Sequence, residues 1–469
     1  MTKKNSYEPK HYPLTPEEWD EVSKMSIEER YPYLHYSVSQ NGYVDVITNQ
    51  IMDHGVIENT FWNSGLTDDK GKPTPFKIVQ ICAPRVNGPY YAPNNPDPYP
   101  VVPILNADGD ETPATGIHYN TWSKTHLQYT SNISEENVLP FIRHMKYLVS
   151  FNDAHYKKLM DWIAWSIQKP EKKLMWAILM ISGQGTGKGT FMDRIIRKLV
   201  GDKNYTQIGV DNLTSKFNTF VENRKVIFVD EIYNSGSENT NQSKIYDRLK
   251  VPISERTMTI EHKGLKPYGV RNYANLFISS NHLNCLKLEQ GDRRIYPILH
   301  KLTLDLTNSD NSQGIPRKLA EQHYLILKDG SNYAEDWVPE NIDKIYSFMM
   351  DWEISPDFSR STPNCENNPD FTELANTALS DTEKTIRDAH DQEHTPFDKI
   401  VVSLSDVKSS LGLQNTQNAI ANAIKGLGFV KKEGKNNNKN YKLWVHNKFK
   451  DYAFIDLFKL WKGEISLNK

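Results

Sequence analysis

A glycine-rich run at residues 182–190 has the composition and the setting of a loop that binds phosphate. It follows the apolar, strand-like stretch from Leu174 to Ile181 and precedes the helical pattern from Phe191 to Val200. In that order, backbone N–H groups converge on phosphate oxygens and the loop lysine reaches the β and γ phosphates. We therefore predict an ATP site formed by Gly183, Gln184, Gly185, Thr186, Gly187, Lys188, Gly189 and Thr190.

The loop departs from the usual G-x-x-x-x-G-K-[ST] pattern at two positions. Ser182 stands where the first glycine is expected, and Gly189 stands where a hydroxyl normally binds Mg²⁺. Thr190, one residue later, is the available substitute, either directly or through a water molecule. We therefore predict Thr190 as a metal ligand together with a carboxylate from elsewhere in the chain.

Two later apolar runs end in polar residues suited to ATP hydrolysis. The run Val226 to Val229 ends in Asp230 and Glu231, and the run Ala274 to Ser279 leads to Asn281. A buried strand that delivers two carboxylates at its end can place Asp230 on Mg²⁺ and Glu231 against the attacking water. We predict that Asn281 senses the γ phosphate or orients that water.

Two basic segments flank the third strand. Arg293 and Arg294 follow it and are predicted as an arginine finger for a neighbouring subunit's nucleotide, the alternative being a surface ion pair with Asp292. Before it, a strand-like stretch from Thr257 leads to a Gly and Pro turn that predicts a hairpin. We expect its tip to contact DNA, or else to be a solvated hairpin, through His262, Lys263 and Lys266.

Taken together, these motifs resemble the superfamily 3 helicases, most of all the helicase part of phage and plasmid primase-helicases. The likeness covers about residues 115 to 305 and includes the helical segment DWIAWSIQKPEKK before the glycine loop. It implies an AAA+-like core, a homo-oligomeric ring that is expected to be a hexamer, ATP hydrolysis between subunits with Mg²⁺, and 3′-to-5′ movement on single-stranded and fork DNA. A separate primase or polymerase is a further expected partner.

Composition narrows the class without identifying a partner. The 469 residues carry 56 Lys and Arg against 58 Asp and Glu, so any nucleic-acid contact must come from local clusters. Three cysteines without a C-x-x-C pair fit a reducing compartment, and no apolar run reaches the length of a membrane span. We expect a cytoplasmic protein without a membrane partner, in a bacterial host if it comes from a phage or mobile element.

Composition shifts also predict the division of the chain. The fold class is α/β, with a P-loop ATPase core flanked by smaller parts. We expect a β-rich region at 1–134, a helical collar at 135–172, the P-loop ATPase core at 173–350, an acidic linker at 351–396 and a basic winged-helix-like domain at 397–469.

The two ends differ in what they indicate. In the tail, two short helical patterns precede two strand-like runs, a winged-helix pattern that predicts DNA contact, with protein docking as the alternative. The expected contacts are Lys431, Lys432, Lys435 and Lys439. In the leader, Asp108 and Asp110 form a D-x-D that is ordinarily a turn, so primase activity is disfavoured.

The leading interpretation is an ATP-driven DNA helicase that acts in the replication of a phage, virus or mobile element. A second is a DNA-binding initiator or scaffold that uses nucleotide only for assembly, and Gly189 keeps it open. A P-loop kinase of a small substrate is disfavoured because the arginine pair and the basic segments would then have no role.

Overall fold

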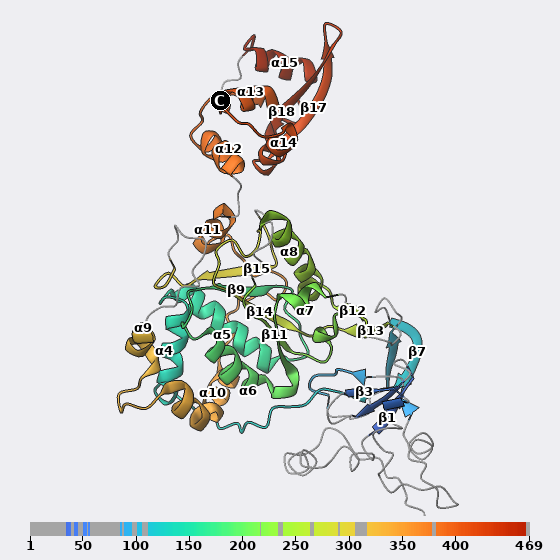
Figure 1. The fold of residues 1–469 in the computed structure, drawn as a ribbon, viewed down its shortest axis with the longest axis vertical. Helices are drawn as coiled ribbons and strands as arrows, with labels where there is room; N and C mark the ends of the chain where they lie inside the picture. The colour runs from blue at the N-terminus through green and yellow to red at the C-terminus, as the bar shows by residue number, and fades with distance from the viewer. Residues whose placement is uncertain are drawn as a thin grey trace, which may run out of the picture. The chain divides into compact units, whose positions relative to one another are not determined.

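The computed structural model describes fourteen segments of the chain, which form two compact units. One unit is Met1–Leu286 with Arg293–Phe371, and the other is Lys287–Asp292 with Thr372–Lys469 (Figure 1). The described segments are 34–38, 42–45, 50–53, 55–56, 85–86, 89–95, 101–105, 111–215, 217–232, 238–262, 267–288, 291–304, 317–377 and 381–465.

The centre of the first unit is a five-stranded parallel sheet with the order β10-β11-β14-β9-β15. Every residue of β9, β11, β14 and β15 is buried, as expected for strands covered on both faces. The prediction of an α/β core with a buried sheet is thus confirmed. The strands are β9 (Ala177–Ile181), β10 (Tyr205–Ile208), β11 (Val226–Val229), β14 (Asn275–Ser280) and β15 (Ile295–Leu299).

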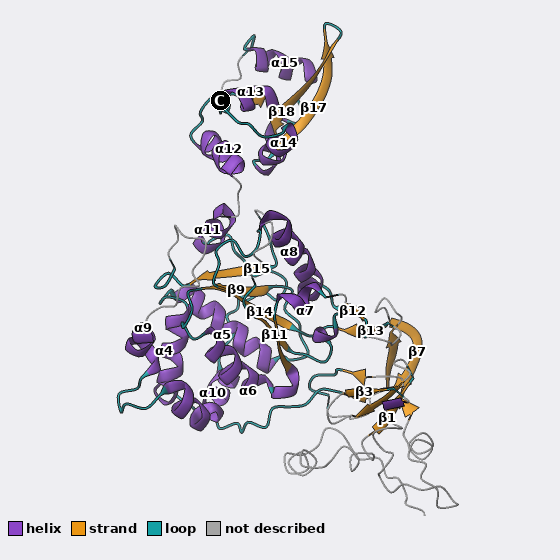
Figure 2. Ribbon diagram, in the orientation of Figure 1, coloured by secondary structure: helices purple, strands orange, loops and turns teal. Residues whose placement is uncertain are grey.

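Helices cover this sheet, and Figure 2 shows them around the central strands. Apolar side chains from α4, α5, α6 and α10 share one core with the strands. The elements are η2 (Glu135–Val138), α4 (Leu139–Leu148), α5 (Asp153–Gln168), η3 (Thr190–Ile196), α6 (Arg197–Val200), η4 (Asp202–Asn204), α7 (Val210–Thr214), η5 (Thr219–Val221), α8 (Glu238–Ser254), α9 (Arg317–Ala320), η6 (Glu321–Leu325), η7 (Tyr333–Trp337), α10 (Val338–Asp351) and α11 (Pro369–Thr377).

The helical pair predicted before the core is present as α4 and α5. Ser150 and Phe151 between them have positive φ angles of 52° and 60°, which turn the chain sharply. Asn152 then caps α5, because its side chain accepts a hydrogen bond from the backbone N–H of His155.

Short strands make up most of the described part of residues 1–134. Four of them form a sheet in the order β3-β2-β1-β4, and the others pair as β5 with β8 and β6 with β7. They are β1 (Leu34–Ser37), β2 (Gly42–Asp45), β3 (Gln50–Met52), β4 (Arg85–Val86), β5 (Pro89–Tyr90), β6 (Val101–Leu105), β7 (Glu111–Ile117) and β8 (Tyr119–Asn120). The D-x-D at Asp108 and Asp110 lies outside the described residues.

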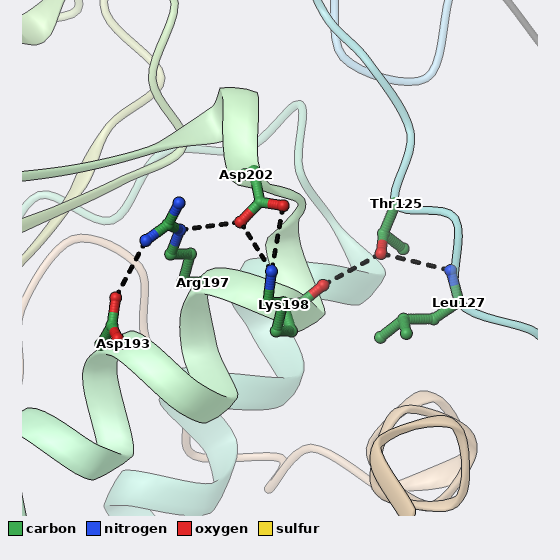
Figure 3. Close-up of polar contacts among 6 residues, drawn as sticks. All are labelled: Thr125, Leu127, Asp193, Arg197, Lys198 and Asp202. Atoms are coloured by element: carbon green, nitrogen blue, oxygen red, sulfur yellow. Dashed lines mark hydrogen bonds and ion pairs between the residues drawn. The ribbon is translucent and has the colours of Figure 1, made fainter. Parts of the chain in front are cut away.

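An extended strap, residues 121–134, runs from β8 across the helices to η2. Figure 3 shows one of its attachments, where Thr125 Oγ1 donates to the carbonyl oxygen of Lys198 at 3.0 Å and accepts from Leu127 N–H. The same view shows the exposed ion pairs of α6, in which Asp202 contacts both Arg197 and Lys198. The strap also reaches α10, where Ser347 Oγ accepts from Thr130 N–H.

The segment 351–396 differs from the linker that its acidic composition predicts, because it forms α11 and α12 (Asp381–Asp391). Ile386 and Ala389 of α12 are buried in the core of the second unit together with Val402, Ile420 and Trp444. An acidic helix with one apolar face can therefore belong to a packed unit even though most of its residues are charged.

The second unit contains the helix pair and hairpin predicted for the tail. Asn437 and Asn438 join the hairpin strands with φ angles of 47° and 60°, as a tight two-residue turn requires. A further helix, α15, packs on the hairpin and is not predicted from the sequence. The elements after α12 are β16 (Val401–Val402), α13 (Leu404–Ser410), α14 (Gln417–Gly426), β17 (Phe429–Asn436), β18 (Lys439–His446), η8 (Asn447–Phe449) and α15 (Phe454–Lys462).

Within the described segments, no helix has both the length and the apolar character needed to cross a lipid bilayer.

Candidate functional site

The connections that leave the neighbouring strands β9 and β14 run toward opposite edges of the sheet. From β9 the chain goes to β10 at one edge of the sheet, and from β14 it goes to β15 at the other edge. In parallel α/β sheets, ligands bind in the crevice beyond the carboxyl ends of two such strands. The glycine loop, defined as residues 183–190, follows β9, and Asn281 follows β14, so both lie at this crevice.

Strand register brings the predicted polar residues together. Ile181 pairs with Ser280, which places Ser182 beside Asn281, and Val229 pairs with Ile278, which places Asp230 beside Ser279. The three apolar runs recognised in the sequence are thus neighbouring strands of one sheet. Their carboxyl ends deliver Lys188, Asp230 and Asn281 to one pocket.

Lys188 is buried at the base of the glycine loop and is held by hydrogen bonds from its ammonium group. Its Nζ donates to Ser182 Oγ at 2.6 Å, to Asn281 Oδ1 at 2.8 Å and to the Ser182 carbonyl oxygen at 3.1 Å. Burial lowers the pKa of Lys188 to about 8, while the nearby charges of Asp230 and Glu231 act in the opposite direction. Ser182, the departure from the glycine pattern, therefore supplies a hydroxyl that positions the lysine.

A buried cluster of aromatic and imidazole rings supports the loop from behind. His144 of α4 stacks on Tyr324 of η6 with ring centroids 4.2 Å apart, and Tyr333 of η7 meets the same histidine edge-on. Burial lowers the pKa of His144 to about 3, so its imidazole is neutral at neutral pH. No sequence motif points to this cluster, because α4 lies far in sequence from η6 and η7.

Gly187 is the loop position that these rings approach most closely. Its φ of +93° lies in the region that L side chains rarely adopt, and an added Cβ would collide with Tyr324 Oη and lie 2.8 Å from His144 Nε2. A side chain at this position would therefore displace either the loop or its support.

We expect Gly187→Ala to lower the free energy of unfolding by about 1–3 kcal/mol and to weaken nucleotide binding, because both φ and packing oppose the methyl group. Gly189→Ala is the matched control. Gly189 is helical, with φ of −61°, and an added Cβ there meets nothing within 4 Å. The control should gain about 0.5–1 kcal/mol. Urea unfolding of both variants measures the difference, and equal stability of the two would contradict this account of the loop.

The two predicted carboxylates have different surroundings. Asp230 accepts hydrogen bonds from Ser279 Oγ at 2.6 Å and from Gln207 Nε2 at 3.0 Å, so its orientation is fixed. Glu231 is exposed and has a φ of +49°, a strained backbone conformation of the kind that is often retained at functional sites. Sequence analysis misses Ser279 and Gln207, although Ser279 lies on a strand already recognised as part of the site.

A pocket of about 650 Å³, a size suited to a nucleotide, is lined by the glycine loop, the carboxylates of Asp230 and Glu231, and Asn281. Its remaining wall comes from residues 320–335, which sequence analysis does not assign to the site. Glu335 of this wall pairs with Arg194 of η3 at 3.2 Å and so connects the wall to the helix after the loop.

The helix after the glycine loop contains a π-helical stretch, Thr190–Ile196. π-Helical turns hold an extra residue per turn and often occur at functional sites. Thr190 begins this stretch and lines the pocket beside Lys188 and Asp230. The predicted metal ligands Thr190 and Asp230 therefore face the same cavity.

The predicted finger residues lie at the opposite end of the sheet. The carbonyl oxygen of Arg294 accepts from Ala177 N–H at 2.8 Å, at the start of β9, whereas the glycine loop follows the end of β9. Arg293 is exposed, and Arg294 Nε donates to Ser254 Oγ at 2.7 Å. Neither arginine lines the pocket of its own chain, and their role as a finger for another subunit stays a prediction.

The hairpin predicted between the second and third core strands is present as β12 (Thr257–Ile260) and β13 (Tyr268–Arg271). His262, predicted to contact DNA, lies 2.9 Å from Glu222 Oε2 and stacks on Tyr268, so it also anchors the hairpin. Lys263 and Lys266 lie outside the described residues.

The tail lysines divide between the two faces of the β17–β18 hairpin, because alternate residues of a strand point to opposite faces. Lys431 and Lys435 share one face, with Glu433 between them in an ion pair with Lys431. Lys432 and Lys439 belong to the face on which α15 packs, where the ring of Phe454 leaves no room for a side chain at Gly434. The structure does not bring the four predicted lysines together.

Comparison with known proteins gives matches of three kinds. Residues 180–294, about a quarter of the chain, match a family described as "Family of unknown function (DUF5906)". A segment of 135 residues is 29% identical to the DNA primase-polymerase of Nitratiruptor phage NrS-1, covering 29% of this chain and 18% of that protein. This chain thus spans about a fifth of the length of its curated relative.

Among solved structures, the apo NrS-1 C-terminal region matches over most of the chain. The TM-score is 0.59 at 15% identity, with 88% of this chain and 95% of that one covered. A second apo structure of the same region gives a TM-score of 0.57 at 15% identity. The structural likeness shows a shared fold, and the sequence match shows that this chain is related to a phage replication protein.

Proposed function

We propose that this protein is an ATP-driven DNA helicase or translocase that acts as a ring in phage replication. The observation that supports this most strongly is the single pocket shared by the glycine loop, Lys188, Asp230, Glu231 and Asn281. The relation to a phage DNA primase-polymerase supports the setting, and the resemblance of the motifs to superfamily 3 helicases supports the activity.

In this proposal, each group that lines the pocket has a part in hydrolysis. Backbone N–H groups of the loop and the Lys188 ammonium would bind the triphosphate of the substrate ATP. Asn281, 2.8 Å from Lys188, would orient the γ phosphate or the attacking water, and the exposed carboxylate of Glu231 would accept the proton of that water.

The residues present fit Mg²⁺ as the metal. Asp230 is held by Ser279 and Gln207 and lines the pocket, and Thr190 offers a hydroxyl to the same pocket. Mg²⁺ bound with phosphates needs only one or two protein ligands, and when bound it neutralises charge on the phosphate oxygens.

Thr190→Ala should weaken Mg²⁺-dependent ATP binding by about tenfold, because the variant removes the hydroxyl that replaces the one missing at Gly189. Adding Gly189→Ser to Thr190→Ala should restore binding, since nothing lies within 4 Å of a Cβ at Gly189. Calorimetric titration with ATP at several Mg²⁺ concentrations measures the ATP affinity of both variants. The same magnesium dependence in Thr190→Ala and in the wild type would mean that water takes this place.

Gly189 favours one second candidate, a DNA-binding initiator or scaffold that binds ATP for assembly without processive unwinding. The two functions differ in strand displacement. We expect the protein to separate a forked DNA duplex with ATP and Mg²⁺ but not with a non-hydrolysable ATP analogue. Binding of the fork without ATP-dependent separation would favour the scaffold.

A further inference from the structure

A second pocket of about 400 Å³ lies at the amino end of the sheet, away from the glycine loop. Its lining includes four basic side chains, Lys173, Arg256, Arg271 and Arg360, and one aromatic ring, Tyr273. We call it the arginine pocket. It adjoins the base of the β12–β13 hairpin, and Figure 1 shows β7, which contributes Glu111 to the lining, beside that hairpin.

Backbone hydrogen bonds fix where the arginines lie. The carbonyl oxygen of Arg256 accepts from Asn272 N–H at 2.7 Å, which closes the base of the hairpin. The carbonyl oxygen of Arg360 accepts from Met175 N–H at 2.8 Å, just before β9. Two segments about 100 residues apart in the chain are thereby held on one cavity.

The charges of this pocket do not balance. Its two carboxylates already have partners, since Glu111 pairs with Arg271 and Glu171 accepts from Asn94 Nδ2 at 3.0 Å. Lys173 is buried and donates to the Pro252 carbonyl oxygen at 2.7 Å, so it supports the framework.

Arg256 and Arg360 are the remaining cations of the pocket, and neither pairs with Glu111 or Glu171. Within the described part of the chain, neither guanidinium group makes an ion pair or a side-chain hydrogen bond. Arg256 is exposed and Arg360 is half-buried, so both can reach a ligand.

We propose that the arginine pocket binds a backbone phosphate of single-stranded DNA, and this rests on the proposed function. Guanidinium groups match phosphate oxygens in pairs, and beside them lies the half-buried ring of Tyr273, which is tilted against Tyr91 at 5.7 Å between centroids and on which a base can stack. The pocket adjoins the Thr257–Arg271 pair at the base of the hairpin, and the Ile260–Tyr268 pair lies three residues further along, roughly 10 Å away. One strand of DNA can therefore contact both the pocket and the far end of the paired strands.

The test is binding of a fluorescent oligothymidylate to the full chain over a range of salt concentrations. Arg256→Gln with Arg360→Gln should lower the affinity about tenfold or more. The slope of log affinity against log salt should become shallower by about 0.7 to 1, because one phosphate contact is lost. The control variant, Arg143→Gln with Lys157→Gln, removes the same charge from exposed sites on α4 and α5. It should change the DNA affinity by no more than about twofold and leave the salt slope unchanged.

Tyr273→Leu provides a second reading, since it should lower affinity and leave the salt slope unchanged. Equal affinities for the pocket variant and the charge-matched control would overturn the proposal. Loss of ATP hydrolysis with unchanged DNA affinity would also overturn it and would assign the arginines to a neighbouring subunit's nucleotide. If the wild type bound no single-stranded DNA, the proposed function itself would fail. If the wild type and the pocket variant bound DNA equally well, only the proposal for the arginine pocket would fail.

Discussion

Lys188→Ala is expected to lower the ATPase rate by on the order of 10² to 10³ or more, because it removes the one ammonium group held at the base of the glycine loop. In the wild type this group bridges Ser182 and Asn281, so the variant also removes a donor from Asn281 Oδ1 and one from Ser182 Oγ. The change is measured as phosphate release at saturating ATP. Lys198→Ala is the matched control, since Lys198 is an exposed lysine whose ammonium pairs with Asp202 on the helix that follows.

The lowered pKa of Lys188 adds a pH dependence with a definite sign. The charged ammonium binds phosphate, and its pKa of about 8 in the free protein means that binding requires proton uptake above pH 8. ATP affinity should therefore fall by up to tenfold per pH unit above pH 8 in the wild type and less steeply in Lys188→Ala. Equal hydrolysis by Lys188→Ala and Lys198→Ala would refute the assignment of Lys188.

The double variant Arg293→Ala with Arg294→Ala should bind ATP, form rings and lose on the order of 10³ to 10⁵ in hydrolysis rate. Both arginines lie at the amino end of the sheet, away from the pocket of their own chain, so we expect the loss to come from the nucleotide of another subunit. Arg293 should account for most of the loss, because Arg294 is tied to Ser254. Phosphate release by the double variant and by each single variant measures how much of the loss each arginine causes.

Mixed rings test whether the finger acts on another subunit. Subunits with Lys188→Ala and subunits with the double arginine variant are each inactive alone. Assembled together from monomers, they should recover some ATPase, because some interfaces then pair an intact glycine loop with an intact finger. An absence of recovery in verified mixed rings, or full ATPase in a verified monomer, would remove the trans-acting finger.

Much of the core could be predicted because each strand is a continuous apolar run. The run ending at Val229 is β11 with the same bounds, whereas the run beginning at Leu174 becomes a strand only at Ala177. Strand order could not be predicted from these runs, since it depends on which helices cross the sheet. The helix α12 was missed because charged residues hide the spacing of Ile386 and Ala389. The helix α15 was missed although Leu457 and Phe458 lie in a mostly apolar run.

The predicted site residues that share the pocket lie in the segments that follow β9, β11 and β14, where the local sequence shows them. Groups placed by tertiary packing were missed, notably Tyr324 and Glu335 in the pocket wall and His144 behind the loop. His262 stays a predicted DNA contact, but its role as an anchor of the hairpin was missed. Its partner Glu222 stands 40 positions earlier and is revealed only by the fold.

The most direct test of the account is steady-state phosphate release from ATP by the full chain, with and without single-stranded DNA. If the pocket hydrolyses ATP to drive movement, Mg²⁺-dependent release should be measurable alone, should rise several-fold with saturating DNA and should be lost in Lys188→Ala. Binding of ATP and DNA without release above the Lys188→Ala background would contradict the account.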